Sequence, residues 1–154
     1  MKTLAALLLV LAAGEAAADT DPIVGKWAYN PARSSYGDAR QALARAYAWY
    51  EIDASGRLRF TSEIHRPDGQ LVRRSWSAAF DGRDYAVAGD PGFDAVALRR
   101  INPHVILFIY KKDDRVLSAQ VREVSPDRKT MTLTQLGVSA DGRVLNNIVF
   151  FERQ

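Results

Sequence analysis

Hydrophobic and polar residues alternate along much of the chain, in short runs that are rich in β-branched and aromatic residues. In residues 57–65, Leu58, Phe60 and Ile64 fall on one face of an extended segment. The opposite face carries Arg57, Arg59, Thr61 and Glu63. A period of two is typical of a β-strand with one buried face. The run therefore predicts such a strand.

Turn sequences rich in Asp, Gly and Pro separate ten runs of this kind. Asp-Gly tolerates the positive φ angles of tight hairpins, and all six prolines lie outside the runs, as strands require. The predicted strands are 24–29, 45–53, 57–65, 71–80, 83–87, 93–101, 104–112, 115–124, 129–138 and 143–152.

The short connections between these runs predict an all-β fold. Nearly every connection has the length of a hairpin, which favours an antiparallel meander and leaves no room for crossover helices. A meander of about ten twisted strands tends to close on itself, because closure removes exposed edges. We therefore expect a closed β-barrel.

The segment 38–49 allows two interpretations. It is rich in Ala, Arg, Gln and Leu, which favour helix, and Asp38 is a suitable N-cap. Tyr47 and Trp49 favour β structure instead. We expect a short helical turn over 38–44 followed by a strand, with a longer helix up to Trp49 as the alternative.

Several predicted strands do not have one clearly buried face. Residues 104–112 are apolar on both faces, which predicts that both are covered or that one lines a cavity or a partner site. In 115–124, Ser118, Gln120 and Arg122 alternate between Val116 and Val124. An inward orientation would require partners for these polar groups. We slightly favour the outward orientation, in which water solvates them.

The N-terminus predicts export. A basic start at Lys2, an apolar run over 4–13 and three alanines at 16–18 are typical of a secretory signal peptide that is cleaved near Ala18-Asp19. A single domain would then span 19–154 in the periplasm or outside a bacterial cell. No second apolar run is long enough to span a membrane.

Charge and chemistry exclude several function classes. The net charge of +3 comes from dispersed arginines, which argues against nucleic-acid binding. The chain has no cysteine, and His65 and His104 are isolated at predicted strand ends. Asp113-Asp114 occupies a hairpin tip, and no G-x-S-x-G or phosphate-binding glycine loop is present. We therefore expect no metal, no cofactor and no enzymatic activity.

The first predicted strand carries Gly25-Lys26-Trp27, a G-x-W sequence that resembles the opening of the lipocalin and calycin barrels. The resemblance implies that Trp27 closes the barrel bottom and packs against an arginine late in the chain. Arg122 and Arg153 are the two candidates for that arginine.

A closer resemblance is to small secreted bacterial lipocalin-like proteins, a largely uncharacterised family. Trp27, Asn30, Ser34 and Tyr36 match its W-x-x-N-x-x-x-S-x-[FY] opening. Phe80-Asp81-Gly82-Arg83-Asp84-Tyr85, the segment 124–132 and Asn146-Asn147 extend the match over almost all of 19–154. The resemblance implies a calycin-type barrel in which Gly25, Trp27, Asn30, Ser34 and Tyr36 have structural roles.

The fatty-acid-binding branch of the calycins implies a site that this chain does not reproduce. That branch binds a carboxylate with Arg and Tyr, two residues apart on the final strand, and covers the barrel with a helix pair. Here Val149 and Phe151 stand at those positions, and there is no space for two helices. We do not expect fatty acid to bind in that mode.

The leading functional hypothesis is a barrel that binds a small, mostly apolar ligand. The expected apolar lining is Phe60, Trp76, Phe80, Leu98, Phe108 and Phe150, and the polar groups expected to orient the ligand are Arg74, Gln120 and Gln135. The alternative is an envelope protein-interaction or inhibitor module that uses an outer sheet face. An enzyme is the least supported reading.

Overall fold

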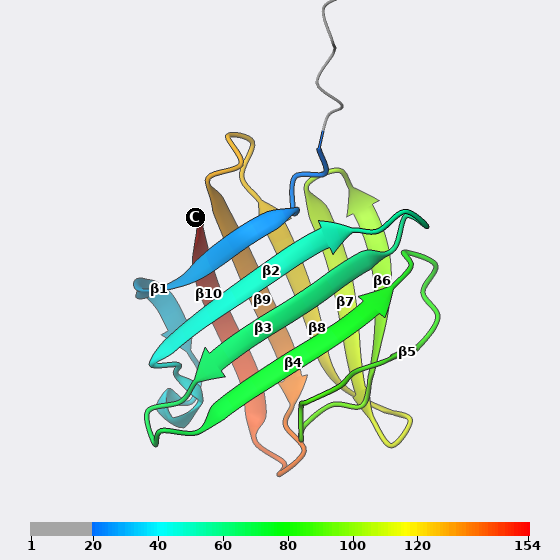
Figure 1. Cartoon of the computed structure of the whole chain (residues 1–154). Coiled ribbons are helices and arrows are strands. Elements are labelled where there is room, and N and C mark those ends of the chain that lie inside the picture. Colours follow the sequence, from blue (N-terminus) through cyan, green and yellow to red (C-terminus); the bar gives the residue numbers. More distant parts are fainter. Residues whose placement is uncertain (1–19) are drawn as a thin grey trace, which may run out of the picture.

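The computed structural model describes residues 20–154 (Figure 1), so the predicted signal peptide and its cleavage site lie outside the described residues. Ten antiparallel strands form one sheet in the order β4-β3-β2-β1-β10-β9-β8-β7-β6-β5. The strands are β1 (Gly25–Tyr36), β2 (Arg45–Ile52), β3 (Leu58–His65), β4 (Leu71–Ala78), β5 (Tyr85–Ala86), β6 (Ala95–Asn102), β7 (Val105–Lys112), β8 (Arg115–Val124), β9 (Thr130–Val138) and β10 (Val144–Arg153).

The first and last strands of the chain lie side by side, since β1 pairs with β10 as well as with β2. The sheet curves into a nearly closed barrel (Figure 1). At the two ends of the sheet, β4 is joined to the segment that follows β5 by an isolated bridge between Ser75 and Ala88. Gly89, with a φ of +76°, packs so closely on Arg73 that a Cβ there would collide with the Arg73 carbonyl oxygen. This seam confirms the predicted all-β meander and its closure.

The helical turn after β1 is confirmed as the 3₁₀ helix η1 (Ala39–Gln41). The Asp38 side chain caps it by accepting a hydrogen bond from the Arg40 backbone N–H. The alternative of a longer helix up to Trp49 is wrong, because β2 begins at Arg45 and pairs with β3 along its whole length.

Strand β1 extends beyond its predicted end. The pairing of β1 with β10 shifts register between Asn30 and Ser35, so Pro31 occupies a bulge, where no ladder hydrogen bond is required of it. Ser34 replaces part of the missing ladder: its hydroxyl donates to the Asn30 carbonyl (2.7 Å) and accepts from the Phe150 N–H (3.0 Å). Two motif residues, Asn30 and Ser34, thus stabilise an irregular stretch of β1.

One end of the barrel is closed by Trp27, which is fully buried. Its indole N–H donates to the Ile23 carbonyl oxygen at 2.8 Å, and the Arg153 guanidinium carbon lies 4.2 Å from its ring centroid. Of the two candidate arginines, Arg153 is therefore the partner of Trp27. Gly25 leaves room for it, since a Cβ at that position would collide with Arg153 Nη1.

An aromatic cluster fills the barrel beside this closed end. Phe60 stacks on Trp76 with ring centroids 4.8 Å apart, and Trp76 contacts Phe108 at 5.8 Å. The Trp76 indole N–H donates to the Tyr110 hydroxyl at 3.2 Å. These contacts make a solid aromatic core at one level of the barrel interior.

Candidate ligand-binding cavity

A cavity of about 410 Å³ lies between the inner faces of the barrel. Loops that border it include the segments 90–93 and 139–143 and the region of η1, and apolar side chains form much of its wall. The apolar lining includes residues of four strands and one loop: Ala46, Ala48, Phe60, Ile64, Phe93, Leu133, Leu145, Val149 and Phe151. A concave space of this size suits a small organic ligand.

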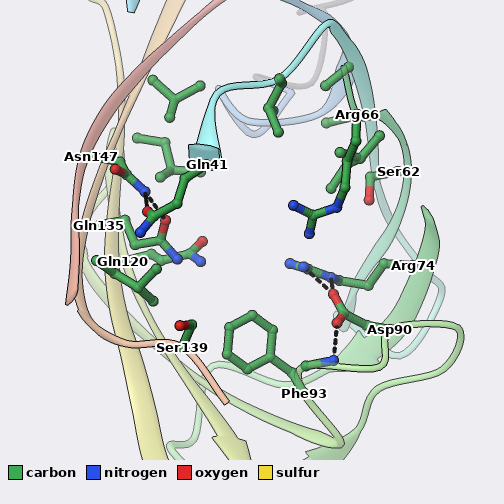
Figure 2. A pocket seen from close by; sticks show the side chains of 18 of the residues that line it. Gln41, Ser62, Arg66, Arg74, Asp90, Phe93, Gln120, Gln135, Ser139 and Asn147 are labelled. Atoms are coloured by element: carbon green, nitrogen blue, oxygen red, sulfur yellow. Dashed lines mark hydrogen bonds and ion pairs between the residues drawn. The ribbon is translucent and has the colours of Figure 1, made fainter. Parts of the chain in front are cut away.

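A wall of amide side chains faces the cavity from β8, β9, β10 and η1 (Figure 2). Asn147 Nδ2 donates to Gln41 Oε1 (2.8 Å) and to Gln135 Oε1 (3.0 Å). Gln135 Nε2 in turn donates to the Ser118 hydroxyl at 3.0 Å. The chain of hydrogen bonds fixes these side chains at the cavity wall, as a buried polar network requires.

The polar residues of β8 point inward, so the outward orientation favoured from sequence is wrong. Ser118, Gln120 and Arg122 are 0%, 3% and 3% exposed. The pairing of β7 with β8 shifts register between Tyr110 and Lys111, and Val116 beyond the shift is 60% exposed. This irregularity breaks the strict alternation on which the sequence interpretation depended.

Arg122 lies at the cavity wall inside a cage of aromatic and polar groups. It donates to the Tyr50 hydroxyl, to the Tyr110 hydroxyl (3.2 Å) and to Gln120 Oε1 (2.9 Å). Its guanidinium carbon is 4.0 Å from the Phe108 ring centroid. Burial raises the pKa of the Tyr50 hydroxyl, so Tyr50 is neutral beside this cation. No carboxylate pairs with Arg122 within residues 20–154.

Arg74 reaches the cavity from β4 and is paired with Asp90 of the β5–β6 loop. The Asp90 carboxylate also accepts a hydrogen bond from the Gly92 N–H at 2.7 Å. The Arg74 guanidinium carbon lies 5.2 Å from the ring centroids of both Phe93 and Tyr110. This ion pair holds the loop against the barrel wall, close to the Ser75–Ala88 seam.

Two further arginines border the cavity. Arg143 pairs with Asp141 in the β9–β10 turn, and hydrogen bonds from Arg143 and Ser139 lower the pKa of Asp141 to about 2. Arg66 follows the last residue of β3, and its buried Nε has no hydrogen-bond partner. Figure 2 shows the Arg66 and Arg74 side chains pointing into the same open space.

Four of the nine residues predicted to bind ligand line this cavity: Phe60, Arg74, Gln120 and Gln135. The other five lie elsewhere. Trp76, Leu98 and Phe108 are buried in the aromatic and aliphatic core and do not form part of the cavity wall. Their inward orientation satisfies the alternation pattern, but neighbouring rings fill the space around them.

Phe80 and Phe150 were expected on the barrel wall, and the structure corrects both positions. β4 ends at Ala78, so Phe80 lies beyond the strand, where Arg100 covers its ring at 4.1 Å. Phe150 lies on the outer face of β10 beneath Arg33, whose guanidinium carbon is 4.5 Å from the ring centroid. The inner face of β10 instead carries the buried side chains of Leu145, Asn147, Val149 and Phe151.

Sequence reasoning missed several cavity residues. Arg66 continues the spacing of Phe60 and Ile64 by one further step, so the period of two could have indicated it. Asn147 shares the parity of Val149 and Phe151. Asp90 and Phe93 come from a loop, and no local pattern places a loop against a barrel interior.

The two histidines lie away from the cavity wall. His104 contacts the Val124 carbonyl oxygen through Nδ1 at 3.0 Å, and His65 Nε2 lies 3.4 Å from Arg45 Nη2. Within the described part of the chain, no group of three His, Cys, Asp or Glu side chains could hold a metal ion. No helix of residues 20–154 is long and apolar enough to cross a membrane.

Comparison with known proteins supports the architecture. No family model and no curated protein matches the chain. Among solved structures, a similar one is zebrafish ileal bile acid-binding protein in complex with cholic acid. The two share a TM-score of 0.52 and 11% sequence identity over 86% of this chain and 99% of that chain. The likeness shows the fold, which is a nearly closed antiparallel β-barrel of ten strands.

Proposed function

We propose that this chain is an exported lipocalin-like protein that binds a small, mostly apolar molecule inside its barrel. The observation that carries the proposal is the cavity of about 410 Å³ with a largely apolar wall and a few convergent polar groups. Such a space gives an apolar ligand more buried surface than a flat face could, and each buried methylene contributes about 0.8 kcal/mol. The proposal assigns no catalytic step to the cavity.

The likeness to a bile acid-binding protein supports the same class of ligand. That protein was solved in complex with cholic acid, a small and largely apolar molecule, and we propose a ligand of that general kind for the cavity of this chain. The final strand does not supply the Arg and Tyr pair of the fatty-acid-binding branch, because Val149 and Phe151 line the cavity at those positions. The ligand would therefore be held by a different set of polar groups.

Two variants of adjacent residues on β3 test this proposal. Ser62 faces the cavity and is buried, whereas Thr61 faces outward and is exposed. Binding of the neutral dye Nile red is measured by fluorescence titration. Ser62→Phe should fill the cavity and weaken binding at least about tenfold, which corresponds to 1.4 kcal/mol. Thr61→Phe should bind like the wild type. Equal binding by both variants would contradict a site inside the barrel.

A second measurement addresses the natural ligand and the compartment. The chain is expressed with its N-terminus, purified and measured by native mass spectrometry. Denaturing extraction of the same sample should release a hydrophobic compound in stoichiometric amount. The mass should also correspond to a mature chain that begins at Asp19, which tests export to the periplasm or the medium. Full-length protein in the cytoplasm would contradict the proposed localisation.

An envelope protein-interaction module remains the second candidate, and the outer sheet face favours it. Leu136, Val138, Ile148 and Val121 are at least 39% exposed on the outer faces of β8, β9 and β10. Exposed apolar patches of this kind often mark interaction sites. Charged substitution of Leu136 should abolish partner capture in that case, and leave Nile red binding unchanged.

A further inference from the structure

The inner face of the β3–β4 hairpin brings three polar groups to one side of the cavity. Arg74 lies opposite Ser62 in the β3–β4 pairing, and Arg66 continues the same inner face just beyond β3. The Ser62 hydroxyl and Arg66 Nε are both buried without a hydrogen-bond partner. In Figure 2 the Arg66 and Arg74 guanidinium groups both lie toward the open centre of the cavity.

The charges that line the cavity do not cancel. The lining contains four arginines and two aspartates: Arg66, Arg74, Arg122, Arg143, Asp90 and Asp141. Asp90 pairs with Arg74, and Asp141 pairs with Arg143. Arg66 and Arg122 have no carboxylate partner within residues 20–154. A charge held away from water without a partner is costly, so an anion that enters the cavity would relieve this cost at the buried Arg122 and, to a smaller extent, at the half-buried Arg66.

The two unpaired arginines differ in the donors that they have free. Arg122 has an unpartnered buried Nε as well, but its Nη1 and Nη2 already donate to Tyr50, Tyr110 and Gln120, and the group is packed against aromatic rings. The buried Nε of Arg66 has no hydrogen-bond partner. Arg74 is held by Asp90 through Nε and Nη2, and Figure 2 shows its guanidinium group beside the same open space. The available donors therefore lie at the β3–β4 hairpin.

We propose that the ligand is an amphipathic anion whose acid group binds between Arg66 and Arg74, with the Ser62 hydroxyl as a further donor. Its apolar body would extend over Phe60 and Phe93 toward Val149. Planar guanidinium groups suit carboxylate, sulfonate and phosphate oxygens equally, so the shared chemistry is an oxyanion on an apolar body. This inference rests on the proposed function, since it assigns the ligand class of the same cavity.

Three ligands that share one alkyl chain test the charge preference. Decanesulfonate, decanol and decyltrimethylammonium are titrated, below their micellar concentrations, against the mature protein loaded with Nile red. The sulfonate should displace the dye at a concentration about tenfold lower than decanol does, because a charge-assisted hydrogen bond adds roughly that factor. The cationic ligand should be the weakest of the three. Equal displacement by sulfonate and decanol would overturn the anion site.

Matched arginine variants locate the site. Arg66→Gln should reduce the preference for sulfonate over decanol to below about threefold, and Arg66→Lys should restore much of that preference. The control is Arg59→Gln, on the exposed outer face of β3, which should behave like the wild type. Equal losses in Arg66→Gln and Arg59→Gln would overturn the location, since they would indicate a general surface-charge effect.

The titrations distinguish a failure of the proposed binding function from a failure of the anion site alone. If the wild type binds neither Nile red nor any of the three alkyl compounds, the binding function and the anion site are both overturned. If the wild type binds Nile red and decanol without any preference for the sulfonate, only the anion site is overturned. Should Arg66→Gln not fold, Arg66→Met gives the same comparison with a side chain of similar length.

Discussion

The Arg153 guanidinium carbon lies over the fully buried ring of Trp27, 4.2 Å from its centroid, and the group donates to three backbone carbonyls. Its Nη1, Nη2 and Nε reach the carbonyl oxygens of Val24, Pro22 and Arg128, each at 2.6 Å. One side chain near the C-terminus thus connects the first strand, the segment before it and the β8–β9 turn. The planar guanidinium group with its several N–H donors, more than its charge, makes these three contacts possible.

Replacing Arg153 with lysine should therefore destabilise the barrel although the charge is kept. Lysine cannot donate to three carbonyls in this arrangement, so we expect a loss of roughly 2–4 kcal/mol in the free energy of unfolding, from hydrogen bonds to a charged group. Urea unfolding measures the change. Arg59→Lys, at an exposed position on β3, should lie within about 0.5 kcal/mol of the wild type. Equal stability of both variants would contradict this role.

Tyr50→Phe should destabilise the protein at neutral pH. The Tyr50 hydroxyl accepts a hydrogen bond from the buried Arg122, and its loss leaves a charged donor without that partner. We expect a cost of about 1.5–3 kcal/mol in the free energy of unfolding. The matched control is Tyr47→Phe, because Tyr47 lies on the same strand with its side chain only half-buried. A change no larger than that of Tyr47→Phe would show that the Arg122 cage contributes nothing.

Because of Tyr50, we also expect the free energy of unfolding to fall at alkaline pH. Burial raises the pKa of Tyr50 above its ordinary value of 10.0, whereas the unfolded chain ionises at that value. The contribution of Tyr50 to the free energy of unfolding is therefore complete below pH 10. It is lost as the pH rises further, by about 1.4 kcal/mol per pH unit. Unfolding free energies at pH 8.5, 10 and 11 should fall less steeply for Tyr50→Phe than for the wild type. Parallel profiles would rule out Tyr50 as the titrating group.

Gly89→Ala should weaken the seam between β4 and β5. Both Gly89 and Gly56 have positive φ angles, +76° and +77°, but only at Gly89 would a Cβ collide with backbone, at the Arg73 carbonyl. Gly56→Ala should cost about 1 kcal/mol through its φ alone. Gly89→Ala should cost at least twice as much and speed amide hydrogen exchange at Ser75 and Ala88, whose N–H groups form the bridge. Equal costs for the two variants would contradict a tightly packed seam.

The barrel could be predicted from sequence because its signals are local. Period-two alternation and Asp-Gly turns define hairpins one at a time, and closure follows from joining them. The short helical turn expected after β1 was also predicted correctly, since Asp38 caps η1. Strand ends were less predictable: β4 stops at Ala78, two residues before Phe80.

The cavity lining could be predicted only in part. In a strand that is apolar on both faces, hydrophobicity does not indicate which residues face the barrel interior. In β10, Ile148 and Phe150 match Val149 and Phe151 in hydrophobicity, so local pattern gave no reason to place Phe150 outward. In β8, a register shift changed the face of Val116 relative to Ser118. Pairs such as Arg74 and Asp90 depend on a loop folding across the seam, which no local signal encodes.

The most direct test of binding inside the barrel is a methyl NMR titration with Nile red. Methyl groups of Leu133, Leu145 and Val149 line the cavity, whereas those of Val121, Leu136 and Ile148 are exposed on the outer faces of β8, β9 and β10. The account predicts saturable shifts and ligand contacts at the first three methyl-bearing residues, and unchanged signals at the other three. Shifts confined to Val121, Leu136 and Ile148 would contradict it.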